Sequence, residues 1–151
     1  MGNTSSLIFQ QSQTAEDVKE IYNFNVKAFA GTHDFTWTEE NINKEIKDGW
    51  SLYSVKVEKD IVAALFLKED AKTLFTKNTP IKLDYQGNGF SHLVKEFYEE
   101  MAKNKGITKL INYCPGDNFR MISLNEGHDY TKTGNTFGEN SEIVEWEKTL
   151  K

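Results

Sequence analysis

Along the first half of the chain the spacing of apolar residues differs from one segment to the next, which predicts a succession of strands and helices. Residues 7–13 are expected to form a short first strand, and the two runs within 50–70, joined by a turn around 58–60, are rich in residues typical of strands. Residues 15–30 repeat apolar side chains every three or four positions, which indicates a helix that buries one face. A shorter helix is expected over 39–49, because a threonine precedes it and a glycine closes it.

The second half of the chain continues with a strand region over 72–83 and a helix over 90–105. Pro80 lies in this strand region and has no N–H for a ladder, which points to a bulge or a free edge. A strand is expected over 107–114 and a helix over 115–127. Two further strands complete the chain, within 128–137 and 141–150. The order β-α-α-β-β-β-α-β-α-β-β predicts an α/β protein with a mixed sheet and helices on both faces.

The helix over 90–105 carries the clearest apolar stripe. Its apolar residues return at successive helical turns, so we expect one face to pack against a sheet. These residues are Phe90, Leu93, Val94, Phe97 and Met101.

Length and composition restrict the classes of protein to which the chain can belong. Its 151 residues suffice for one domain, which we expect to span 1–151 with a loose tail over 1–6. That tail also satisfies the N-myristoylation signature, which matters only in a eukaryotic host. The formal net charge is −5 and no long basic run occurs, so a nucleic-acid partner is disfavoured. The sequence shows neither an apolar run of membrane-spanning length nor a signal-peptide pattern, so we expect a cytoplasmic protein with no membrane partner.

Two glycines stand immediately before the helix over 90–105, where a single Ser, Thr, Asp or Asn would serve as a cap. The short turn consists of Gln86, Gly87, Asn88 and Gly89. The first N–H groups of a helix have no internal partner and lie at the positive end of its dipole, and glycines let the backbone approach an anion closely. The turn is therefore either a phosphate site or a simple mobile turn.

Two common phosphate motifs are excluded by the residues of this turn. It lacks the Gly-Lys-Ser or Gly-Lys-Thr of a P-loop and the third glycine of a dinucleotide fingerprint. It also lies in mid-chain after several strands, so the Rossmann interpretation fails as well.

The turn belongs to a longer pattern of residues. Gln86, Gly89 and Ser91 match Gln/Arg-x-x-Gly-x-Gly/Ala, with serine in place of the usual small final residue. A second motif, Asn-x-x-Ala-x-x-Leu-Tyr-Glu-x-x-Gly-Phe, falls without a gap on Asn118, Met121, Leu124, Asn125, Glu126, Asp129 and Tyr130. With these motifs and its order of elements, the chain resembles the GNAT superfamily of acetyl-CoA-dependent N-acyltransferases over nearly its whole length.

The resemblance implies a GNAT fold, with a mixed, mostly antiparallel sheet of about six or seven strands that is splayed at the middle. Acetyl-CoA or another acyl-CoA is the implied cosubstrate, with its pyrophosphate on the backbone amides of 87–91. The pantetheine arm would pair with 79–83, and the thioester would lie where that strand and 107–114 separate. Asn118 would contact the arm, cap a helix, or do both. The implied coenzyme-binding residues are Ile81, Leu83, Gln86, Gly87, Asn88, Gly89, Phe90, Ser91 and Asn118.

The implied reaction is transfer of an acetyl or acyl group to a primary amine by direct attack on the thioester in a ternary complex. In the family a tyrosine protonates the departing thiolate, but Asn125 stands at that place, and an amide cannot supply the proton. General acid catalysis contributes about 10²–10⁴-fold, so its loss slows the reaction without forbidding it. Tyr113, Tyr130 or ordered water are the alternative acids. The candidate bases are Glu69, Asp70 and His33, each of which has the alternative interpretation of a solvated surface residue.

Two classes of function remain open. One is an acyl-CoA-dependent N-acyltransferase that acts on a small-molecule or peptide amine, for which the acidic net charge is compatible with a cationic acceptor. The other is a catalytically degenerate, CoA-binding sensor or protein-interaction module of the same fold, which the residue Asn125 favours. The resemblance also makes a homodimer plausible, and no metal is expected. Cys114 lacks an identifiable His–acid partner, so we expect it to be buried packing.

Overall fold

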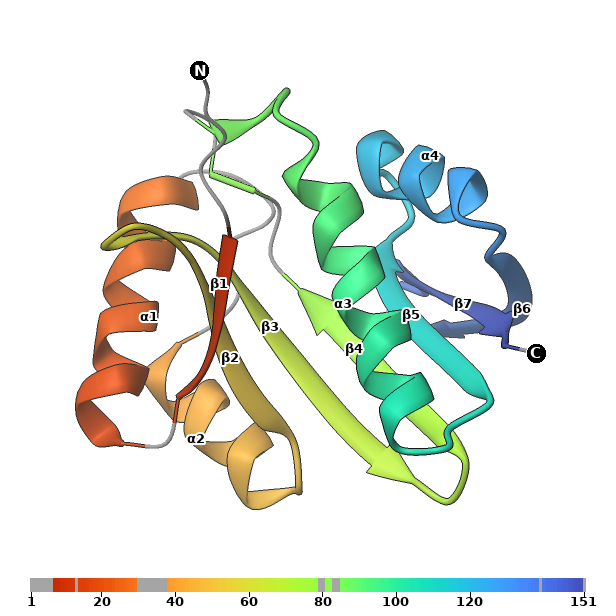
Figure 1. Ribbon diagram of the computed structural model, residues 1–151, viewed down its shortest axis with the longest axis horizontal. Coiled ribbons are helices and arrows are strands. Elements are labelled where there is room, and N and C mark those ends of the chain that lie inside the picture. The colour runs from red at the N-terminus through yellow and green to blue at the C-terminus, as the bar shows by residue number, and fades with distance from the viewer. Residues whose placement is uncertain are drawn as a thin grey trace. The chain divides into compact units, whose positions relative to one another are not determined.

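The computed structural model describes residues 7–12, 14–29, 38–78, 81–82, 85–138 and 140–150. Four helices and seven strands follow the predicted order (Figure 1). Their bounds are β1 Leu7–Ser12, α1 Ala15–Phe29, α2 Glu39–Lys47, β2 Ser51–Val57, β3 Asp60–Asp70, β4 Thr73–Asn78, α3 Phe90–Asn104, β5 Lys109–Pro115, α4 Phe119–Gly127, β6 Thr131–Phe137 and β7 Ile143–Thr149.

The strands form one sheet with the hydrogen-bonded order β1-β2-β3-β4-β5-β7-β6. β1 with β2, β2 with β3, β5 with β7 and β6 with β7 are antiparallel pairs. β4 and β5 are parallel, and α3 lies between them in the chain, as a parallel connection requires. The expected mixed, mostly antiparallel sheet is therefore confirmed.

One predicted strand is shorter than expected. The strand region over 72–83 forms a strand only as far as Asn78 among the described residues, and Ile81 and Lys82 lie outside any strand. Thr79, Pro80 and Leu83 lie outside the described residues. The Lys82 N–H donates to the Val62 carbonyl at 2.7 Å, so Lys82 is hydrogen-bonded to β3 although it belongs to no strand.

The chain divides into two compact units. Unit 1 comprises Met1–Leu67 with Asn78–Phe90, and unit 2 comprises Lys68–Lys77 with Ser91–Lys151. β3 passes from the first unit into the second. The expectation of one domain over 1–151 stays a prediction.

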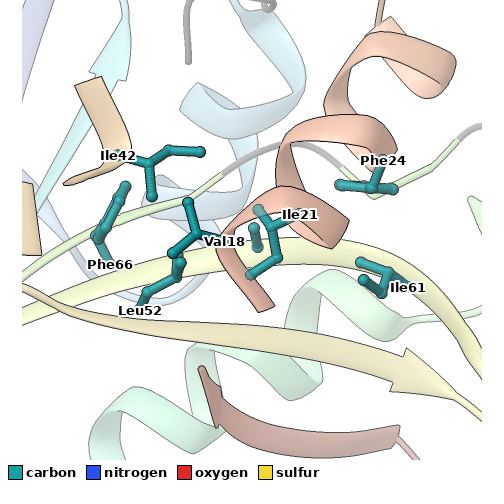
Figure 2. Packing of buried hydrophobic residues seen from close by; sticks show 8 residues of the cluster. Val18, Ile21, Phe24, Ile42, Leu52, Ile61 and Phe66 are labelled. Carbon is teal, nitrogen blue, oxygen red and sulfur yellow. The ribbon is translucent and has the colours of Figure 1, made fainter. Parts of the chain in front are cut away.

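Unit 1 is built around an apolar cluster between α1, α2 and the strands β2 and β3 (Figure 2). Both helices begin where a threonine caps them: the Thr14 Oγ1 accepts from the Asp17 N–H at 3.1 Å, and the Thr38 Oγ1 accepts from the Asn41 N–H at 3.1 Å. The helices thereby present their apolar faces to the strands. The cluster consists of Val18, Ile21, Phe24, Ile42, Leu52, Ile61, Ala64 and Phe66, with Tyr22 and Trp50 packed against it.

In unit 2 the buried face of α3 differs from the predicted apolar stripe. Val94, Tyr98 and Ala102 are buried, but Leu93 is 38% exposed. Lys95 is 2% exposed, although it is the one charged residue of this buried face. Residues four positions apart share a helix face, so the buried face is centred between Val94 and Lys95 and turns Leu93 toward the surface. The inclusion of Leu93 in the packed stripe was wrong.

The cluster of unit 1 predicts a difference between two isoleucines of α2. Ile42→Ala is expected to lower the free energy of unfolding by about 2–5 kcal/mol, because Ile42 is 1% exposed and its loss leaves a cavity. Ile46→Ala is the matched control in the same helix: Ile46 is 36% exposed, so a change within about 0.5 kcal/mol is expected. Urea denaturation followed by circular dichroism measures both, and equal losses would contradict this packing.

Candidate functional site

The turn over 85–89 is held in a defined shape by its own side chains. The Gln86 Nε2 donates to the Ile81 carbonyl at 2.7 Å, and the Asn88 Nδ2 donates to the Tyr85 carbonyl at 3.1 Å. The Tyr85 hydroxyl donates to the Asp60 Oδ2 at 2.6 Å, which anchors the turn to the start of β3. Gln86 therefore has a structural role in fixing the turn, and the simple mobile turn is disfavoured.

Both glycines of the turn have backbone conformations that favour glycine. Gly87 has φ +85° and Gly89 has φ +78°, and no atom lies within 4 Å of the place where a Cβ would stand on either residue. Within the described ranges, none of the N–H groups from Gly87 to Ser91 donates a backbone hydrogen bond. These groups open α3, where the helix dipole contributes about half a positive charge. The turn thus presents bare N–H donors beside open space, which suits an anion.

Three other predicted coenzyme residues are described by the structure. Asn118 is the N-cap of α4, and its Oδ1 accepts from the Met121 N–H at 3.2 Å. The cap interpretation of Asn118 is therefore observed. Ile81 is buried, and Phe90, also buried, has its ring 6.4 Å from the ring of Tyr85.

The parallel ladder between β4 and β5 ends before the strands do. Its register runs from Thr73 opposite Lys109 to Thr76 opposite Asn112, whereas β4 continues to Asn78 and β5 to Pro115. We call the point beyond the Thr76–Asn112 pair the ladder opening. β5 stays paired with β7 as far as Pro115 opposite Ile143, so only its edge toward β4 is released. Among the described residues β4 and β5 are therefore no longer paired beyond Asn112, and the predicted splay between 79–83 and 107–114 stays a prediction.

A chain of buried polar side chains ends at the ladder opening. The Asn112 Nδ2 donates to the Thr76 Oγ1 at 3.0 Å, and the Thr76 Oγ1 donates to the Ile111 carbonyl at 2.7 Å. The Asn125 Nδ2 donates to the Asn112 Oδ1 at 3.3 Å, and the Lys95 Nζ donates to the Asn125 Oδ1 at 2.5 Å. We call these four residues, Lys95, Asn125, Asn112 and Thr76, the Lys95 network. Asn125 is fully buried in this network.

The amine of Lys95 lies among aromatic rings. Its Nζ is 4.2 Å from the centroid of the Tyr130 ring and 5.8 Å from that of Tyr98. None of the ion pairs between described residues includes Lys95. Burial lowers the pKa of Lys95 from 10.5 to about 7, because the charged form loses its hydration. Lys95 is therefore close to half-charged near neutral pH.

Tyr113 faces away from the Lys95 network, because successive strand residues point to opposite sides of a sheet. It pairs across the ladder with Glu145, and the two side chains are hydrogen-bonded. Burial and Glu145 raise the pKa of Tyr113, so its phenol stays protonated. Burial opposes the charge of Glu145, but hydrogen bonds from Asn135, Thr133 and Tyr113 outweigh it and hold the pKa of the carboxyl below its ordinary value.

Tyr130 and Cys114 are buried beside the Lys95 network. Within the described part of the chain the Tyr130 hydroxyl has no hydrogen-bond partner, and burial raises its pKa. The Cys114 Sγ accepts from the Asn125 Nδ2 at 3.8 Å, and burial raises the pKa of the thiol. A thiol that keeps its proton is a poor nucleophile, so the expectation that Cys114 is buried packing agrees with its surroundings.

Two of the three predicted bases, Glu69 and Asp70, do not lie at the ladder opening. Glu69 and Asp70 are exposed at the end of β3, beside the residues where the β4–β5 ladder begins, and Glu69 pairs with Lys105 at 3.2 Å. His33 lies outside the described residues. Two other histidines do meet: the His92 Nδ1, in the first turn of α3, is 2.8 Å from the His128 Nε2.

Sequence reasoning missed Lys95, Asn112, Thr76 and Glu145. The only local signal is the spacing of Lys95 in α3, one position after Val94 and three before Tyr98, which places it on the buried face. Among the described residues no three His, Cys, Asp or Glu side chains gather as metal ligands, and none of the helices described is long and apolar enough to cross a membrane.

The lowered pKa of Lys95 predicts a pH dependence of stability. Between about pH 7 and about pH 10 the unfolded chain keeps the proton of Lys95 and the folded chain releases it, so folding is favoured as the pH rises. Well below pH 7 Lys95 is protonated in the folded and the unfolded chain alike, so the folded chain carries the full cost of burying the charge. Lys95→Met removes this linkage, so its free energy of unfolding should rise by about 2–3 kcal/mol relative to the wild type when the pH falls from about 9 to about 6.

Urea denaturation at a series of pH values measures this difference. Lys103→Met, at an exposed position of the same helix, is the matched control and should run parallel to the wild type. Parallel curves for Lys95→Met and the wild type would contradict the lowered pKa.

Comparisons with known proteins give one consistent result. Neither a protein-family model nor a curated protein matches the chain. Among solved structures, the ribosomal-protein-S18-alanine N-acetyltransferase from Escherichia coli has a TM-score of 0.77 at 14% identity, over 96% of this chain and 94% of its own. PaiA N-acetyltransferase from Thermoplasma acidophilum in complex with coenzyme A has a TM-score of 0.73 at 13% identity, over 96% of this chain and 99% of its own. A GNAT family acetyltransferase from Elizabethkingia anophelis with acetyl-CoA bound has a TM-score of 0.72 at 16% identity, over 97% of this chain and 100% of its own. The chain therefore has the GNAT fold, as its sequence motifs predicted.

Proposed function

We propose that the protein is an acyl-CoA-dependent N-acyltransferase, in the simplest case one that transfers an acetyl group from acetyl-CoA to a primary amine. The observation that carries the proposal is the turn before α3. Its N–H groups from Gly87 to Ser91 donate to no backbone acceptor in the described ranges, and open space adjoins Gly87 and Gly89. A diphosphate fits such donors, because it needs several N–H groups and close backbone approach.

Two parts of coenzyme A each have a matching feature in this chain. The turn offers donors to the diphosphate, and the ladder opening offers the released edge of β5 beyond Asn112. An extended ligand with amide groups can pair with such an edge as an added strand. Coenzyme A or acetyl-CoA is bound in three structures that share this fold, which supports a coenzyme site in this chain.

In the proposed reaction the amine attacks the thioester directly, without a covalent intermediate on the protein. A neutral amine attacks the thioester carbonyl, the C–N bond forms, and the C–S bond breaks with its electron pair on sulfur. An alkylamine with a pKa near 10.4 requires roughly 4–5 kcal/mol to become neutral at pH 7, so a group that accepts its proton helps. Tyr113 with Glu145 is the pair of titratable groups beside the ladder opening on the face opposite Asn125. We assign this pair to the amine side of the reaction: the ionised Glu145 carboxylate is the group that accepts the proton of the amine, and the Tyr113 hydroxyl, which stays protonated, holds that carboxylate in place.

The acceptor is proposed only by class, as a small-molecule or peptide amine. The net charge of −5 favours the approach of a cationic acceptor. Among proteins of the same fold, one is named as a ribosomal-protein-S18-alanine N-acetyltransferase and another is titled a putative phosphinothricin N-acetyltransferase, so the fold is compatible with both kinds of acceptor. A cytoplasmic location and a homodimer stay predictions.

A second candidate is a module of the same fold that binds coenzyme A without turnover. Asn125 favours it, because the amide cannot donate a proton to a thiolate and is fully buried. The two candidates share the coenzyme site and differ in whether free thiol is released.

The turn predicts the outcome of one substitution without knowledge of the acceptor. Gly89→Leu is expected to weaken coenzyme A binding by at least about 100-fold, because the side chain would force the turn away from φ +78° and occupy the space beside the N–H donors. Gly106→Leu is the matched control: Gly106 has φ +69° and the same open surroundings, but it follows the other end of α3. Titration calorimetry with coenzyme A measures both. Equal affinity for both variants would mean that the glycine turn does not hold the coenzyme.

Release of free thiol from acetyl-CoA in the presence of a panel of amines separates the two candidates. Turnover on at least one amine is expected, and Tyr113→Phe should reduce it by about 10–100-fold, because the variant loses the hydroxyl bonded to Glu145 but keeps its ring against Phe137 at 5.5 Å. Tight binding of coenzyme A with no thiol release on any amine would favour the binding module instead.

A further inference from the structure

Two histidines join the start of α3 to the end of α4. The His92 Nδ1, in the first turn of α3, is hydrogen-bonded at 2.8 Å to the Nε2 of His128, which is the C-cap of α4. The centroids of the two rings are 5.0 Å apart. We call this pair the histidine clip. Neither ring has a part in the proposed reaction, so the clip needs a separate explanation.

A hydrogen bond between two imidazole nitrogens exists only while one of the facing nitrogens lacks a proton. One nitrogen must donate and the other must accept, and a ring that is protonated on both nitrogens can only donate. The contact therefore tolerates one charged ring but not two. With both rings charged, two N–H groups and two positive charges would face each other across 2.8 Å. The clip is thus sensitive to pH in the range where histidine titrates.

His128 is the ring that resists protonation. Burial lowers the pKa of His128 from its ordinary value of 6.5, because the charged ring loses hydration. The positive charges of His92, Lys95 and Lys148 lower this pKa further. Glu99 acts in the opposite direction, but it already forms an ion pair with Lys148 at 3.1 Å. We therefore assign the acceptor role to the His128 Nε2 and the donor role to the His92 Nδ1.

Positive charge gathers around the clip as the pH falls. His92, Lys95 and Glu99 lie on one face of α3, because residues three, four or seven positions apart in a helix share a face. The buried amine of Lys95 has a pKa of about 7, so it becomes fully charged in the same range in which histidines take up protons. Among the described groups that act on His128 by charge, one carboxylate stands against three cations. Acid therefore increases repulsion at a contact that requires a neutral ring.

We propose that the histidine clip is an acid-sensitive contact, which holds the end of α4 against the start of α3 while His128 is neutral and releases it once both rings carry a proton. Release is expected below about pH 6.5, because the pKa of His128 is held under that value. α3 begins directly after the glycine turn, and α4 contributes Asn125 to the Lys95 network, so the clip joins two helices that carry these features. The proposal does not rest on the proposed function, because the clip involves neither coenzyme nor acceptor.

Amide hydrogen exchange between about pH 7 and about pH 5, corrected for the intrinsic pH dependence of exchange, tests the proposal. In the wild type the protection of the α4 amides is expected to fall by about tenfold or more over this range, because proton uptake by His128 favours the open state. The amides of α1, which belongs to unit 1, are the internal control. Their protection should stay within about twofold.

Two variants keep the clip closed in acid. His128→Gln places an amide where the Nε2 stands, and His92→Asn places one where the Nδ1 stands. A side-chain amide has both a donor and an acceptor and does not titrate, so it can bind a protonated histidine as well as a neutral one. Both variants should therefore keep the protection of α4 at about pH 5. Both also retain Lys95, so a loss caused by the charge of Lys95 alone would remain in them.

Each outcome decides the proposal. A loss of α4 protection in the wild type that is absent from the amide variants supports the clip, and either variant suffices if the other fails to fold. Constant protection of α4 in the wild type would overturn the proposal. An equal loss in the wild type and the variants would assign the effect to Lys95, and equal losses in α4 and α1 would indicate global unfolding. Both of these results also overturn the proposal.

Discussion

The early end of the parallel ladder between β4 and β5 is the constraint on which the candidate chemistry depends. Four pairs of residues join these strands, and the fourth is Thr76 with Asn112. Beyond it β5 remains bound to β7, so the strand keeps its straight course while its other edge is released. Backbone N–H and C=O groups require partners, and a released edge inside a sheet is therefore a place where water or an extended ligand completes the pairing.

Buried polar side chains hold that opening in place. The Thr76 hydroxyl and the Asn112 amide bind each other and the strand backbone, and Asn125 binds Asn112 from α4. Each of these groups is fully buried, so a missing partner would cost the whole desolvation of the group left behind. The last residue of the network is Lys95, where hydrogen bonding satisfies the amine but leaves its charge without a carboxylate contact among the described residues. The buried charge of Lys95 therefore costs stability at this point of the fold.

The proposed anion site at the glycine turn depends on local structure instead of on contacts between distant segments. It requires only local features, namely a helix start, two glycines with positive φ, and side chains that tie the turn to its neighbours. In unit 1 the apolar cluster between α1, α2, β2 and β3 stabilises β3, to whose first residue, Asp60, the Tyr85 hydroxyl is anchored. The turn is therefore defined before any ligand arrives, and a ligand that meets preformed donors loses less entropy on binding.

The sequence by itself determined the order of the eleven elements and the existence of the glycine turn. It did so because hydrophobic period, capping threonines and positive-φ glycines are properties of a few neighbouring residues, as Thr14, Thr38 and Gly89 illustrate. The tertiary structure decided where β4 ends, which face of α3 is buried, and which groups meet Asn125. The partners of Asn125 lie 30 residues away at Lys95 and 13 residues away at Asn112, and Asn112 meets Thr76 across 36 residues. No local pattern encodes such contacts, because burial and pairing of a polar side chain depend on segments that folding alone brings together.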